Sequence, residues 1–267
     1  MTEQRKREIE KEASDTRKLA EILTPGISDI FEVCDTLNIY YVRYPLGQDA
    51  ILGAAILRED DHIIFSNSSV VLSREIFTVA HELGHIRLGH LNSQYSKIKD
   101  YSFSEETDEK EAEANYFAAC FLMPREQVIL LPEKLQITEW TPLEVVRMQS
   151  IFNTSFDATV TRLASLHKIT KAKQEELLQK KANIKVSSIL RTIGKDASLC
   201  FSDQSKAISI DYLKWIVSNY SNGLIPKETV EKALGYLGIH FEDVIDEERI
   251  PVAEDFDLDD FLEGNGE

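Results

Sequence analysis

The sequence is poor in cysteine, in long apolar runs and in basic charge. Its 267 residues include three cysteines, Cys34, Cys120 and Cys200, which lie far apart and form no CxxC pair. An odd number of scattered cysteines argues against a disulfide framework and against a cysteine-based zinc site. The longest apolar run, Ala50 to Leu57, is eight residues, far short of the ~20 that cross a bilayer. We therefore expect no membrane partner and a core built from ordinary apolar packing.

Basic charge is scarce because 30 Lys and Arg face 46 Asp and Glu, which gives a formal net charge of −16. The segment from Glu242 to Glu267 holds twelve acids and one base, so most of the excess lies there. Proteins that bind phosphate backbones rely on clustered Lys and Arg. We therefore expect a protein or peptide partner and no direct binding to nucleic acid. Residues 2–12 lack the apolar stretch of a secretory signal, which favours a cytoplasmic protein.

Hydrophobic periodicity predicts an α+β fold, mainly helical, with a small antiparallel β-sheet and a helical C-terminal domain. Apolar side chains recur every three to four residues in the helical segments and dominate the strand segments together with β-branched and aromatic residues. Helices are predicted at about 9–23, 27–37, 73–88, 106–122, 143–152 and 156–167, and strands at 39–44, 50–57 and 62–65.

The chemistry-bearing motif is His81-Glu82-Leu83-Gly84-His85, an HExxH sequence in a segment that is apolar nearly all round. Residues four apart share one face of a helix, so both imidazoles can reach one metal ion. Zn²⁺ binds such nitrogens and keeps a position for water, beside which Glu82 is placed to act as general base. The alternative is two metal-free core histidines, whose burial costs free energy. Gly84 predicts the close approach of another backbone, because glycine within a helix otherwise costs ~1 kcal/mol relative to alanine.

The third ligand does not follow directly after this motif. The longer pattern HExxHxxGxxH is excluded, because Leu88 and Leu91 occupy its glycine and third-histidine positions. His90 follows the expected end of the helix, and we expect it to point away from the metal-binding face.

The next predicted helix offers carboxylates instead. Glu111 lies on a stripe of small and apolar residues that includes Asn115 and Ala118, so this face can pack closely against the HExxH helix. We predict Glu111 as the third metal ligand. Asn115, one turn further on, is predicted to hold a ligating imidazole and fix its tautomer. Glu109 and Glu113 are predicted to be solvated.

Both motifs, followed by a Leu-Met-Pro ending, occur in one order: residues 77–85 read FTVAHELGH, residues 111–118 read EAEANYFA, and residues 121–124 read FLMP. In these segments the chain resembles the ImmA/IrrE family of metallopeptidases, over about residues 25–170. The resemblance implies that His81, His85 and Glu111 bind zinc and that Glu82 is catalytic. It also implies a cytosolic protease that cuts helix-turn-helix repressors.

The predicted organisation follows from these assignments. Residues 1–170 form a zincin-like metallopeptidase domain, which includes a helix-turn-helix-like hairpin at 141–169. Residues 171–185 carry mixed charge and few apolar side chains, which predicts a linker. Residues 186–250 form the helical C-terminal domain, and residues 251–267 form an acidic tail.

The predicted reaction is peptide-bond hydrolysis, in which Zn²⁺ polarises the scissile carbonyl and Glu82 carries the proton. His90, Tyr95 and Tyr101 are the candidates for stabilising the oxyanion. Residues 62–67 are the strand on which an extended substrate is expected to dock.

An alternative is a zinc-containing regulator that acts by protein or DNA binding without proteolysis. The hairpin at 141–169 has a helix-turn-helix pattern. However, Arg147, Arg162 and Lys168 face Glu144 and Asp157 there, a net charge of +1, which is too small for a phosphate-binding surface.

Overall fold

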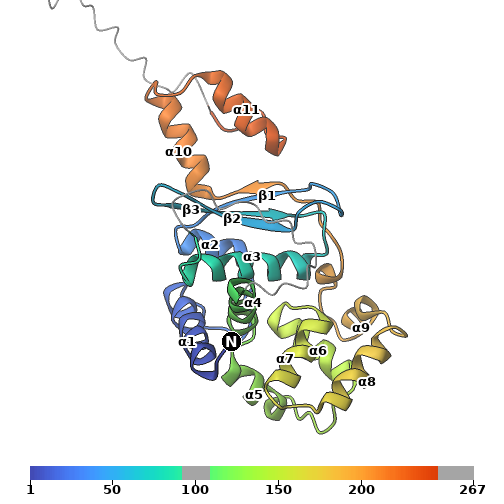
Figure 1. Cartoon of the computed structure of the whole chain (residues 1–267). Coiled ribbons are helices and arrows are strands. Elements are labelled where there is room, and N and C mark those ends of the chain that lie inside the picture. Colours follow the sequence, from blue (N-terminus) through green and yellow to red (C-terminus); the bar gives the residue numbers. More distant parts are fainter. Residues whose placement is uncertain (92–108, 246–267) are drawn as a thin grey trace, which may run out of the picture. The chain divides into compact units, whose positions relative to one another are not determined.

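A computed structural model describes residues 1–91 and 109–245 of the chain (Figure 1). The chain separates into two compact units, of which the first is Met1–Ile210 and the second begins at Asp211. None of the described helices has the length and hydropathy that a membrane span requires. The α+β class, with helices dominating a small sheet, is confirmed.

Four strands of the described chain form one sheet in the first unit, in the order β2-β3-β1-β4. They are β1 (Tyr40–Tyr44), β2 (Gly53–Arg58), β3 (Asp61–Asn67) and β4 (Ala207–Ile208). β2 and β3 form an antiparallel hairpin, whereas β3 runs parallel to β1 and β4 runs antiparallel to β1. The sheet is therefore mixed, and the expectation of a fully antiparallel sheet is wrong for the β1–β3 pair. After β1 the chain crosses to the outer strand first, so β3 returns beside β1 in the same direction.

Helices account for most of the first unit. They are α1 (Glu3–Leu19), α2 (Ile30–Thr36), α3 (Leu72–Arg87), α4 (Glu109–Leu122), α5 (Arg125–Lys134), α6 (Pro142–Phe152), α7 (Phe156–Ser165), α8 (Lys171–Lys181) and α9 (Val186–Thr192), with a 3-10 turn η1 (Ser198–Cys200). Side chains of Thr2, Thr141 and Ser155 cap α1, α6 and α7 by accepting backbone N–H bonds, which satisfies donors that a helix start leaves free.

The core of this unit lies around α3. Figure 1 shows α2 and α3 along one face of the sheet, with α4 crossing α3 on the side away from the strands. Val79, Ala80 and Leu83 of α3 are fully buried, as are Phe117 and Phe121 of α4. Burial on both sides makes α3 the central element, as its apolar sequence predicts.

The segment 171–185, expected as a linker, contains α8 in the structure. Leu177 of α8 and Leu190 of α9 are fully buried and belong to the main core, together with Phe152 and Val160 of the α6–α7 hairpin. Leu177 is the one fully buried side chain of α8, and Leu178 packs against the same core while partly exposed, so the helix needs few apolar residues. The compact unit consequently continues to Ile210.

The second unit has its own small core. α10 (Ile210–Ser221), α11 (Lys227–Leu237) and the 3-10 turn η2 (Phe241–Asp243) supply it. Its buried side chains are Ile216, Val230, Leu234, Phe241 and Ile245. The predicted acidic tail, 251–267, lies outside the described residues.

Candidate metal centre

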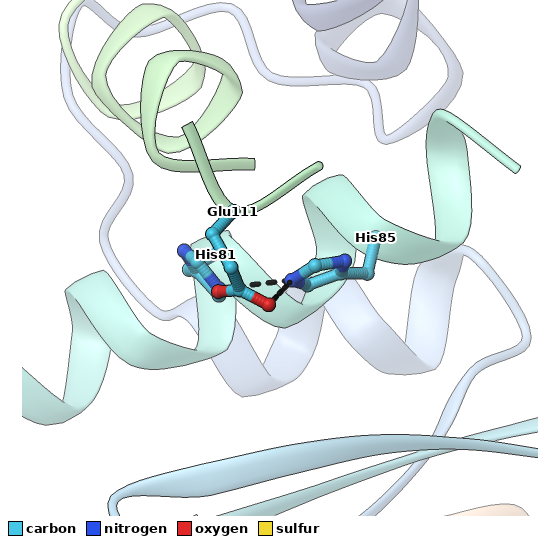
Figure 2. A group of neighbouring side chains, drawn as sticks. All are labelled: His81, His85 and Glu111. Carbon is cyan, nitrogen blue, oxygen red and sulfur yellow. Dashed lines mark hydrogen bonds and ion pairs between the residues drawn. The ribbon is translucent and has the colours of Figure 1, made fainter. Parts of the chain in front are cut away.

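The two histidines of the HExxH motif lie on adjacent turns of α3 and point to the same side (Figure 2). Their Nε2 atoms are 3.0 Å apart. Both residues are buried between the sheet and α4. The helical spacing of four residues produces this approach, because it stacks one side chain above the other.

α4 brings a carboxylate to the same point. Glu111 Oε2 lies 3.2 Å from His81 Nε2, and Glu111 Oε1 lies 3.4 Å from His85 Nε2. This proximity depends on Gly84 of α3, where an added Cβ would lie 3.2 Å from the backbone of Ala114. The predicted close approach of a second backbone at Gly84 is thus confirmed, and it places Glu111 over both imidazoles (Figure 2).

In each imidazole, the hydrogen bond made by the outer nitrogen, Nδ1, determines whether the inner nitrogen, Nε2, carries a hydrogen atom or a lone pair. His81 Nδ1 lies 2.9 Å from Asn115 Oδ1, the partner predicted for a ligating imidazole. An amide oxygen only accepts hydrogen bonds, so His81 donates from Nδ1 and its Nε2 presents a lone pair. In this tautomer the buried Glu111 Oε2 receives no hydrogen bond from His81. Nitrogen and oxygen acceptors therefore converge on one point.

Converging acceptors repel one another unless protons or a cation lie between them. One ligand atom from each of His81, His85 and Glu111 can be chosen so that all three lie within 4.8 Å of one another. Two imidazoles and a carboxylate are a typical donor set for a transition-metal ion. When protons fill the space instead, hydrogen bonds from His81 and then His85 hold the pKa of the Glu111 carboxyl well below its usual range. Glu111 is therefore an anion at neutral pH, as a metal ligand must be.

Glu82 lies beside this cluster, at the edge of the sheet. It is 3% exposed, and a Cβ added to Gly53 would lie 3.7 Å from Glu82 Cγ and 2.5 Å from Thr78 Cγ2. Only glycine permits β2 to begin so close to α3. β2 is the outer strand of the sheet, so the edge of β2 starts next to Glu82.

The expectation that an extended substrate docks on residues 62–67 is contradicted by the sheet. β3 occupies this segment and pairs with β2 on one side and with β1 on the other. Both rows of its backbone hydrogen-bonding groups are used, so an incoming strand finds no edge there.

The family model described as the IrrE N-terminal-like domain matches residues 34–164. Metallopeptidase ImmA of Bacillus subtilis (strain 168) is 31% identical over 99 residues, which are 37% of this chain and 56% of that relative. Residues 34–164 belong to the ImmA/IrrE family. The chain aligns with little more than half of the length of the relative it matches, and helix α1 precedes the family segment.

Two residues of the ImmA/IrrE-family domain, His90 and Glu113, do not lie where the sequence predicted. His90 does not point away from the cluster, because its Nδ1 lies 3.1 Å from His85 Nδ1. The left-handed turn at Gly89 (φ 68°) redirects the chain after α3 and brings His90 back. Glu113 is not solvated, because it accepts a two-pronged ion pair from Arg5 and contacts His90.

Arg5 had no signal in the sequence beyond its place among alternating charges. Its partner Glu113 is 108 residues away, and only the packing of α1 against α4 brings them together. Glu109 is exposed at the start of α4, as predicted. Tyr95 and Tyr101 lie outside the described residues.

Proposed function

We propose that this protein is a zinc-dependent endopeptidase that cleaves a helix-turn-helix transcriptional repressor. The observation that carries the proposal is the convergence of His81, His85 and Glu111 on one point, with Glu82 at the next position of α3. Zn²⁺ is the ion we assign, because two imidazoles and one carboxylate leave a fourth position for water in catalytic zinc sites. The family of residues 34–164 supports the same chemistry.

Each residue has a distinct role in the proposed hydrolysis. When bound, Zn²⁺ supplies Lewis acidity for the scissile carbonyl and lowers the pKa of water. Glu82 accepts a proton from the attacking water and passes it to the departing amine nitrogen. Asn115 holds the Nδ1–H of His81, so that the Nε2 lone pair stays turned toward Glu111.

β2 is the strand on which we place the substrate. It pairs with β3 on one side and is an edge strand of the described sheet. An extended peptide that adds to this edge passes Gly53 and therefore Glu82. Backbone pairing of this kind selects extended segments largely independently of sequence, which suits a protease that recognises exposed chain.

A largely apolar cavity of about 970 Å³ is lined by residues of α3, α4 and α7 and reaches Asn115, the hydrogen-bond partner of His81. Ala112 and Asn115 line it next to the metal-binding residues, and Phe77 and Tyr116 supply aromatic walls. We propose that it receives an apolar side chain of the substrate, since apolar walls with few polar groups are typical of such pockets.

The helix-turn-helix-like hairpin lacks the free basic side chains that DNA binding needs. Arg162 is buried and donates to the carbonyl of Met123, while Arg147 pairs with Glu144. Two of the three basic side chains of the hairpin are thus engaged within the protein. The repressor substrate rests on the resemblance of the motifs to the ImmA/IrrE family.

Co-expression with a candidate helix-turn-helix repressor tests the proposal. We expect a discrete repressor fragment with the wild type, none with Glu82→Gln, and zinc bound by both. Glu109→Gln is the matched control, because it makes the same change at an exposed position of α4. Cleavage of an unfolded test protein, without cleavage of the repressor, would overturn the substrate and leave the peptidase. Undiminished cleavage by Glu82→Gln would overturn the mechanism.

A further inference from the structure

A continuous line of side chains runs from helix α1 to a metal-binding imidazole. Arg5 Nε donates to Glu113 Oε1 at 2.7 Å, and Arg5 Nη2 donates to Glu113 Oε2 at 2.6 Å. Glu113 Oε2 lies 3.1 Å from His90 Nε2. His90 Nδ1 lies 3.1 Å from His85 Nδ1. The line therefore ends at Nδ1 of His85, whereas the other ring nitrogen, Nε2, faces Glu111.

The hydrogen atoms along this line can be arranged in one consistent way. A guanidinium only donates, so both oxygens of Glu113 accept from Arg5. The carboxylate then also accepts from His90 Nε2–H, which leaves the lone pair of neutral His90 on Nδ1. That lone pair accepts Nδ1–H from His85. His85 must consequently carry its own lone pair on Nε2, the atom that faces Glu111.

The inner part of the line is shielded from water. The side chains of Glu113 and His90 are 9% and 6% exposed, whereas that of Arg5 is 35% exposed. Water cannot readily replace the inner partners, so the hydrogen bonds keep their direction.

We propose that Arg5, Glu113 and His90 are positioning residues that hold His85 in its metal-binding tautomer and thereby make metal affinity depend on helix α1. The proposal rests on the proposed function for the metal site itself. α1 precedes the segment 34–164 that matches the family, so this dependence is a property of the chain around the domain. Partners that orient a ligating histidine typically contribute ~10–100-fold to metal affinity.

Arg5→Gln in the full chain is the sharpest test, because Arg5 is the exposed end of the line and its replacement leaves the buried residues in place. The matched control is Glu12→Gln. Glu12 also lies on α1 and pairs with Arg87 of α3 at 2.8 Å, with side chains 31% and 30% exposed. Each change removes one ion pair between α1 and another helix, and Arg5→Gln also removes the Arg5–Glu8 pair within α1. Only Arg5→Gln interrupts the line to His85.

The measurements are the zinc affinity of each variant by competition with a chelator, the visible absorption of its Co²⁺ form, and the melting temperature of its metal-free form. We expect Arg5→Gln and His90→Gln to bind zinc ~10-fold or more weakly and to shift the Co²⁺ bands. Glu12→Gln should match the wild type in both, whatever its melting temperature. Arg5→Lys, which keeps the charge without the fork, should lie between.

Three other outcomes would contradict either the positioning role or the proposed function. Wild-type zinc affinity in Arg5→Gln and His90→Gln would overturn the positioning role while leaving the proposed function intact. An equal loss in Glu12→Gln would also overturn it, because the effect would then be a general loosening of α1. A wild type that binds neither zinc nor Co²⁺ would overturn the proposed function and this inference together.

Discussion

His81 and His85 meet one carboxylate from adjacent turns of α3, yet their outer nitrogens are held in different ways. His81 uses Asn115, an exposed amide one turn beyond Glu111 on the same helix. His85 uses buried His90, which connects through Glu113 to α1. The first arrangement is local and in contact with water, whereas the second is shielded and spans the fold. Two neighbouring histidines of one cluster can therefore differ in how strongly the rest of the protein controls them.

The largest effect should come from the residue that both histidines share. Glu111→Ala removes the carboxylate and leaves the two imidazoles without it, so zinc affinity should fall by more than the ~100-fold upper range for losing an outer partner. Equilibrium dialysis with metal analysis measures this. Glu109→Ala, an exposed glutamate of the same helix, is the control. Full zinc stoichiometry in Glu111→Ala would move the third ligand to another residue.

A second change separates the stability of α3 from the holding of its ligands. Glu75 of α3 is fully buried and accepts two bonds of 2.8 Å from Arg43 of β1. Glu75→Gln removes the buried carboxylate that pairs with Arg43, which keeps Asp203 as its remaining ionic partner. The change should lower the free energy of unfolding by about 3 kcal/mol. Urea denaturation measures the loss. Zinc affinity of the folded variant should stay at the wild-type value, and a parallel fall in affinity would contradict the separation.

The two outer partners themselves should differ in the size of their effects. Asn115→Ala removes an exposed amide that water can replace, so zinc affinity should fall by less than ~10-fold. His90→Gln removes a buried partner that water cannot replace, and its loss should be the larger of the two. Chelator competition on both variants in one buffer decides the order. Equal losses would show that burial of the partner does not matter here.

Much of the candidate site is readable from the sequence because its members are close together along the chain. His81 and His85 are four residues apart, as are Glu111 and Asn115, and a helix brings such residues onto one face. Gly84 likewise signals the approach of α4.

The remaining features depend on contacts between distant segments. Arg5 and Glu113 are 108 residues apart, and β4 reaches β1 from residue 207. Local periodicity carries no information about such partners, since tertiary packing chooses them. The parallel direction of β1 and β3 escaped prediction for the same reason, because hydrophobic alternation is equal in either direction. α8 looked like a linker because only two of its side chains, Leu177 and the partly buried Leu178, pack into the core.

The smallest expected effect distinguishes the two sides of the site by pH. Burial lowers the pKa of His90 below its ordinary value of 6.5. The unfolded chain then binds a proton at a higher pH than the folded protein does, so this group makes the folded state less stable as the pH falls below about 6.5.

In metal-free protein, His90→Gln should lose less unfolding free energy between pH 7 and pH 5 than the wild type does. Asn115→Ala removes no titratable group and should keep the wild-type slope. Denaturant titrations across this range in the presence of a chelator measure the slopes. If the wild type and His90→Gln gave parallel curves, the pKa of His90 would be the same in the folded and the unfolded chain. The burial that distinguishes the partner of His85 from the partner of His81 would then have no effect on protonation.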